Sequence, residues 1–95
     1  MIIISDYDVS KLGIASELVK KTEDKRVLLL SDALYLLSSE TSEIVNKMMS
    51  IGVTFIALEA DVKKRGVETK KSLIVASYEG LVDQMLERKT EIINL

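Results

Sequence analysis

The sequence predicts a three-layer α/β/α sandwich on a mostly parallel sheet of four to five strands, with a single domain over residues 1–95. The first observation is a series of short apolar runs without polar alternation, which is typical of strands covered on both faces. The second is that longer amphipathic stretches separate these runs. Strands that alternate with helices in this way indicate βαβ units with right-handed crossovers.

Five segments are expected to form strands. Four are apolar runs, and the fifth is a short tail expected at an edge of the sheet: residues 2–4, 27–30, 53–58, 73–76 and 91–94. Aromatic residues make up only 4% of the chain, so we expect Ile, Leu and Val to build the core.

Three helices are expected where apolar residues recur at intervals of three and four, near residues 12–19, 44–49 and 78–86, and a short helix, the third along the chain, is expected between the last two of these, at residues 59–65. Gly66 follows the third helix and is expected to end it in a left-handed conformation. Ser77 precedes the last helix and is expected to cap its N-terminus. Met48 and Met49 lie on the apolar stripe of the second helix, where methionine usually fills the core.

The composition excludes several kinds of catalysis. Without cysteine the chain offers no thiolate nucleophile or persulfide, and without histidine it lacks the side chain best suited to proton transfer near neutral pH. A formal charge of −2 gives no overall attraction to nucleic acid or to an anionic membrane. The apolar N-terminal run is too short for a signal peptide, and no run has the length of a membrane span. We expect a cytoplasmic protein that is not an enzyme, holds no cofactor or metal and does not bind nucleic acid directly.

Polar residues follow the first four expected strands, at the edge where parallel sheets bind ligands. Four carboxylates that could in principle hold Mg²⁺ would lie there, those of Asp6, Asp32, Glu59 and Asp61. The favoured interpretation is helix capping, because capping alone predicts these residue types after a strand. The glycines are isolated from one another, so no phosphate-binding loop is expected.

One basic cluster follows the third strand, at Lys63, Lys64, Arg65, Lys70 and Lys71. The favoured interpretation is a solvated loop whose charges complement the dipole of the preceding helix. The alternative is a docking patch for an acidic partner or an RNA backbone.

Tyr35 and Tyr78 are the aromatic residues most open to a functional role. Tyr35 lies in the apolar stretch 33–37, which must be buried in the core or against another subunit, and a subunit interface is slightly favoured. Tyr78 begins the apolar face of the last helix, so we expect it to pack in the core with its hydroxyl at the rim.

Three segments resemble the DsrH/TusB family, a branch of the small DsrE/DsrF/DsrH sulfur-relay proteins. Residues 27–33 form an apolar run that ends in an aspartate and a small residue. Residues 55–66 join a strand, an acidic turn that begins at Glu59, a short helix and an Arg-Gly pair. The third segment is the C-terminal order of strand, Ser-Tyr pair, amphipathic helix and β tail. The positions that match the family motif are Asp32, Asp61, Arg65 and Gly66. Arg65 could pair with Asp61, four residues earlier on the same helix.

This resemblance implies a five-stranded parallel sheet and membership of a complex with cysteine-bearing DsrE-like and DsrF-like (TusD- and TusC-like) chains. In TusB-like systems the complex passes persulfide sulfur toward 2-thiolation of a tRNA wobble uridine, and in DsrH-like systems it serves sulfur oxidation. Some DsrH-type members carry a cysteine in the first helix, where this chain has Ser16, Glu17 and Leu18. We therefore expect a non-catalytic subunit of a sulfur-relay complex, with the tRNA-linked role favoured.

Two alternatives to this function stay open. The chain could be a self-contained homo-oligomer that keeps the fold without a sulfur-carrier role. Less favoured is a small metal- or ligand-binding enzyme that uses the carboxylates at the edge of the sheet.

Overall fold

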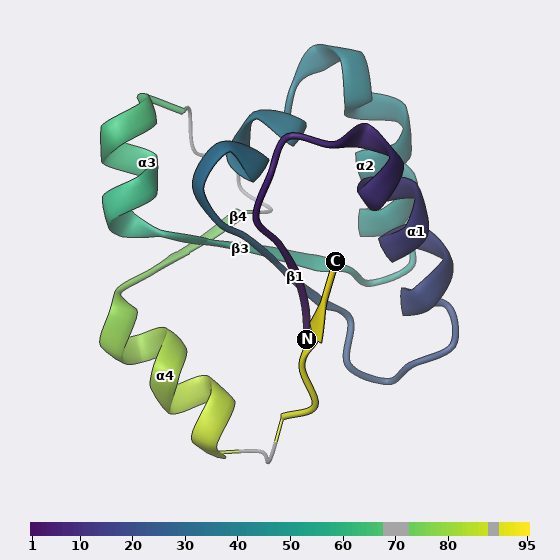
Figure 1. Ribbon diagram of the computed structural model, residues 1–95. Coiled ribbons are helices and arrows are strands. Elements are labelled where there is room, and N and C mark those ends of the chain that lie inside the picture. The colour runs from purple at the N-terminus through teal and green to yellow at the C-terminus, as the bar shows by residue number, and fades with distance from the viewer. Residues whose placement is uncertain (68–72, 88–89) are drawn as a thin grey trace.

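The computed structural model describes residues 1–67, 73–87 and 90–95, and in this part of the chain five strands form one sheet (Figure 1). The strands lie in the order β4-β3-β2-β1-β5, and every neighbouring pair is parallel. Their bounds are β1 (Ile2–Ile4), β2 (Arg26–Leu29), β3 (Thr54–Leu58), β4 (Leu73–Ala76) and β5 (Ile93–Asn94). The predicted fold class is confirmed, and the C-terminal tail pairs with β1 as an edge strand.

Helices connect the strands near the predicted positions. They are α1 (Val9–Val19), α2 (Ser42–Ser50), α3 (Glu59–Arg65) and α4 (Tyr78–Glu87), with the 3₁₀ helices η1 (Ser31–Leu36) and η2 (Ser39–Thr41). Gly66 ends α3 with a φ of 59°, which confirms the predicted left-handed terminus. The Ser77 hydroxyl accepts a hydrogen bond from the backbone N–H of Gly80 at 3.0 Å, so the predicted cap of α4 is confirmed.

One face of the sheet is covered by α1, α2, α3 and η1 (Figure 1). Alternate strand residues such as Ile4, Leu29 and Phe55 point to this face and pack against Leu12 and Met48 of the helices. Each of these side chains is almost fully buried. This larger core is mainly aliphatic, as the composition predicts, and Met48 fills it as expected.

The opposite face is covered by α4 (Figure 1). Leu81 and Met85, one turn apart on α4, pack against Ile3, Leu28 and Ile56 of the sheet. The order of the strands explains this division. The chain moves in one direction from β1 to β4, so right-handed crossovers place the first helices on one face, and the return to β5 places α4 on the other.

The burial of Tyr78 was predicted wrongly. Its side chain is 72% exposed, although it lies at the start of the apolar pattern of α4. Leu81 and Met85 form the contact with the sheet, and Tyr78 lies in the first turn, where α4 begins beyond the end of β4.

None of the helices in the described ranges has the length and hydrophobicity that a bilayer crossing requires.

Candidate functional site

The carboxyl edge of the sheet brings together two of the segments that resemble the family. Asp61 lies in the first turn of α3, and its carboxylate accepts a hydrogen bond from the backbone N–H of Ser31 at 3.0 Å, just after β2. The same carboxylate pairs with Arg65 at 3.1 Å, which confirms the expected pairing along the helix. Asp61 therefore joins the end of β2 to α3.

Arg65 lies between two carboxylates. One guanidinium nitrogen contacts Asp61, and two others contact Asp32 at 3.3 Å. The Arg65 side chain is only 13% exposed, so this residue faces its own fold rather than an external partner. The matching family positions Asp32, Asp61 and Arg65 thus form one structural cluster between η1 and α3.

Ser31 adopts a left-handed backbone conformation with a φ of 53°, which is uncommon for a residue with a side chain. Its N–H is held by the Asp61 carboxylate. A charge-assisted hydrogen bond of this kind offsets part of the conformational cost, so the turn after β2 depends on α3.

The basic cluster predicted from the sequence is divided in the structure. Arg65 is turned inward, while Lys63 is exposed and pairs with Glu59 at 3.0 Å. Lys70 and Lys71 lie outside the described residues. The structure therefore removes Arg65 from any exposed basic surface.

The capping interpretation of the carboxyl edge is correct at Ser77 and wrong at Asp6 and Asp32. The cap of α1 is Asp8, whose carboxylate accepts hydrogen bonds from the hydroxyl and backbone N–H of Ser10. These bonds lower the pKa of the Asp8 carboxyl. No side chain caps η1 or α3, because Leu30 and Leu58 occupy those cap positions.

The four carboxylates considered for Mg²⁺ are instead paired with cations. Asp6 lies 2.8 Å from the Lys11 ammonium, Glu59 pairs with Lys63, and the two aspartates of the β2–α3 junction share Arg65. Across the described residues, no group of three acidic side chains is placed to share a metal ion. Each of these four carboxylates therefore has a cationic partner within the chain.

A shallow groove is formed by the segments that follow β1 and β2. It has a volume of about 410 Å³ and is lined by Tyr7, Tyr35, Ser38 and Glu40. The neighbours of Tyr35 in η1, Ala33, Leu34 and Leu36, are buried in the core, while Tyr35 itself is 45% exposed, and its place at a subunit interface stays a prediction. Tyr7 is equally exposed, and the sequence analysis did not select it. The feature of the sequence that could have indicated Tyr7 is its position shortly after β1, at the edge of the sheet where ligands bind.

Apolar side chains are also exposed at the other edge of the sheet. Ile74 of the edge strand β4 and Tyr78 and Leu86 of α4 are each between 48% and 74% exposed. We call these three residues the β4–α4 surface. Exposed apolar groups on an edge strand and an adjoining helix are typical of surfaces that bind other chains.

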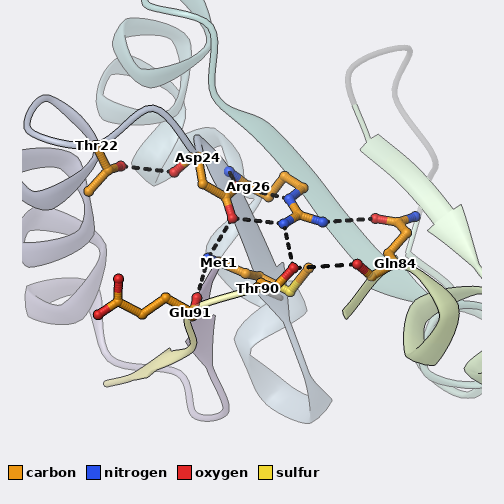
Figure 2. Close-up of polar contacts among 7 residues, drawn as sticks. All are labelled: Met1, Thr22, Asp24, Arg26, Gln84, Thr90 and Glu91. Atoms are coloured by element: carbon orange, nitrogen blue, oxygen red, sulfur yellow. Dashed lines mark hydrogen bonds and ion pairs between the residues drawn. The ribbon is translucent and has the colours of Figure 1, made fainter. Parts of the chain in front are cut away.

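The amino edge of the sheet holds a second charge cluster, which the sequence analysis did not predict (Figure 2). The Asp24 carboxylate accepts hydrogen bonds from the Arg26 guanidinium at 2.7 and 2.8 Å and from the N-terminal ammonium of Met1 at 2.8 Å. Arg26 also donates to the Thr90 hydroxyl at 3.1 Å, and the Met1 ammonium to the carbonyl oxygen of Glu91 at 2.8 Å. The cluster therefore joins β1 and β2 to the segment before β5.

The charges of this cluster stabilise one another. Hydrogen bonds from Arg26, with a smaller contribution from the N-terminal ammonium, hold the pKa of the Asp24 carboxyl well below its usual range. The Asp24 carboxylate in turn raises the pKa of Arg26. A cavity of about 620 Å³ opens beside the cluster. The cations that line it already have partners, since the Lys25 ammonium is bonded to the carbonyl oxygens of Val19 and Thr22.

Comparison with models of protein families gives a match to the DsrH family, described as DsrH like protein, over residues 5–91. A search of curated proteins finds no match. The matched range contains the Asp32–Asp61–Arg65 cluster, the Tyr7–Tyr35 groove and the β4–α4 surface. The match covers nearly the whole sequence, and the structure has the parallel sheet that the resemblance implied. This chain therefore belongs to the DsrH family.

Proposed function

We propose that the chain is a subunit of a cytoplasmic sulfur-relay complex in which a cysteine-bearing DsrE-like or DsrF-like partner carries the persulfide. The complex would serve 2-thiolation of a tRNA wobble uridine. In this proposal the chain is not an enzyme, and its role is to shape and stabilise the assembly.

The observation that carries the proposal is a DsrH-family chain without a thiol. The family is one of small sulfur-relay proteins. A persulfide forms on a cysteine sulfur, and this sequence contains no cysteine. Any relay that includes this chain must therefore keep its sulfur on another subunit.

The β4–α4 surface supports a role in assembly. Leu86 and Tyr78 are more than 70% exposed on α4, and Ile74 is 48% exposed on β4, an edge strand of the sheet that the structure describes. A second chain that covered this surface would remove apolar area from water, at about 25 cal/mol for each Å² buried.

The first test is an affinity pull-down of the tagged chain from its native host, with mass spectrometry of the recovered proteins. We expect small cysteine-bearing proteins of similar size in a fixed ratio to the bait. Recovery of the chain alone as a defined homo-oligomer, measured by light scattering, would contradict the proposal and favour self-association.

Two matched variants test the β4–α4 surface in the same experiment. Leu86→Glu places a charge on this surface, and Asn46→Glu places the same charge on an exposed position of α2. We expect at least about a tenfold loss of partner from Leu86→Glu, since a buried unpaired carboxylate costs several kcal/mol, and none from Asn46→Glu.

The sulfur-relay role is tested with the recovered partners. A complex loaded with radiolabelled persulfide sulfur should carry the label on the partner and transfer it toward tRNA only when this chain is present. Label on this chain, or transfer to tRNA that is independent of it, would contradict the proposal.

A further inference from the structure

We propose that the groove between Tyr7 and Tyr35 binds an arginine side chain of a partner protein, with the guanidinium against the tyrosine rings and paired with the Glu40 carboxylate. This inference names the chemical group of a partner that the groove would bind. It rests on the proposed assembly role only in taking the arginine to come from a partner protein.

The topology places the two rings at one edge of the sheet. Tyr7 follows β1 and Tyr35 lies in η1 directly after β2, and these strands are paired with Ile4 opposite Leu29. Both segments therefore leave the sheet side by side. Their rings are 48% and 45% exposed and line one groove with Ser38 and Glu40. Two aromatic rings that remain half-exposed in one hollow form a surface for a flat or apolar group.

The charges around the groove select a cation. The segments 5–8 and 31–41 contain four acidic residues and no lysine or arginine: Asp6, Asp8, Asp32 and Glu40. Lys11 and Arg65 reach this edge from other segments, and they pair with Asp6 and Asp32. Glu40, which lines the groove itself, forms no ion pair with any residue that the structure describes. A positively charged group is the complement of this edge.

Arginine matches the groove better than other cations. A guanidinium is planar, stacks on aromatic faces and offers donors that can bind the Glu40 carboxylate and the Ser38 hydroxyl together. Stacking of RNA bases on the same rings would bring phosphates next to the carboxylates of this edge, so the observed charges disfavour it.

The test uses the isolated chain labelled with ¹⁵N and two peptides, acetyl-Gly-Arg-Gly-amide and the same peptide with citrulline, which is the neutral analogue of arginine. We expect the arginine peptide to shift the amide signals of residues 5–8 and 34–41. The citrulline peptide should bind at least about fivefold more weakly, since it lacks the cation–π contact and the ion pair. Because no partner is present, failure here leaves the outcome of the pull-down unaffected.

Three variants locate the binding site. Tyr35→Leu and Glu40→Gln should each weaken binding about two- to fivefold, the range expected for one exposed cation–π contact or ion pair. Tyr78→Leu removes an exposed tyrosine from α4 and should leave the affinity unchanged. Equal binding of the two peptides, or wild-type affinity in both groove variants, would overturn the proposal. Tighter binding of a single-stranded RNA oligonucleotide through the same amides would overturn the assignment of a protein partner.

Discussion

The substitution Asp24→Asn tests whether the cluster at the amino edge stabilises the sheet. Asparagine keeps the shape of the side chain and one acceptor oxygen but removes the negative charge. In the wild-type protein this charge accepts two hydrogen bonds from Arg26 and one from the Met1 ammonium. The variant would leave both cations without their counterion.

The expected loss of unfolding free energy is about 2 kcal/mol. Hydrogen bonds to a charged group contribute about 1.5–3 kcal/mol each, and breaking a buried ion pair costs about 3–5 kcal/mol. The value is reduced here because the Asp24 side chain is 33% exposed and solvent screens its charge. For a domain of this size, about 2 kcal/mol lowers Tm by roughly 8–16 °C.

The assay is thermal and urea unfolding of both proteins, each expressed with its own N-terminus because the Met1 ammonium is one of the partners. Glu43→Gln is the matched control, since Glu43 is 87% exposed and its one ion pair among the described residues is with Lys47 along α2. We expect this control to change stability by less than about 0.5 kcal/mol. The reasoning is refuted if Asp24→Asn destabilises the protein no more than the control does.

The pH dependence gives an independent check of the same cluster. The pKa of Asp24 is depressed in the folded protein, so its contribution is fully present above the ordinary value of 3.8 and declines as the pH falls further. The asparagine variant has no such titration. The stability difference between the two proteins should therefore be constant from pH 7 to about 5 and shrink by about 1.4 kcal/mol per pH unit below about 4. A difference that stays constant down to pH 3 would contradict a charge-based origin.

Three further predictions concern the carboxyl edge and the core. In urea unfolding, Ser31→Gly should be at least as stable as the wild type, and Ser31→Val should lose at least about 1 kcal/mol of unfolding free energy, because a left-handed conformation strains a branched side chain. The opposite order of stability would contradict a strained turn at Ser31. Asp61→Ala should lower the free energy of unfolding by about 2 kcal/mol, because it removes the partner of the Ser31 backbone N–H and of Arg65. Asp32→Ala, at a 67% exposed position, should lower it by less than about 1 kcal/mol. Equal losses in the two variants would be inconsistent with these contacts. In thermal unfolding, Leu34→Ala should cost about 2–5 kcal/mol and Leu86→Ala less than about 0.5 kcal/mol, since only the first is buried.

The parts of the fold that were predictable from the sequence depend on local patterns. Continuous apolar runs identify the strands because both faces of a parallel sheet are covered. The end of α3 follows from Gly66, whose left-handed conformation ends the helix. The Asp61–Arg65 pair was predictable for the same reason, since its members are one helical turn apart.

The contacts that were not predictable join segments far apart in the chain. Ser31 and Asp61 are 30 positions apart, and Arg26 and Thr90 are 64 apart. Composition and periodicity carry no information on which acidic group meets which cation across such distances. The cap of α1 was assigned to the wrong aspartate for a related reason. Both Asp6 and Asp8 precede the helix, and only the residue at which the helix begins decides which of them is the cap.

In the structure, the Asp32–Asp61–Arg65 cluster is separate from the exposed apolar side chains. Asp61 and Arg65 contact their own chain, whereas Tyr35 is exposed in η1 and Leu86 is exposed on α4. A substitution in this cluster should therefore weaken assembly only to the extent that it unfolds the chain. A substitution at Tyr35 or Leu86 should weaken assembly while the free energy of unfolding stays the same, because exposed side chains contribute little to the folded monomer. We therefore expect the partner specificity of the proposed complex to depend on residues outside this cluster.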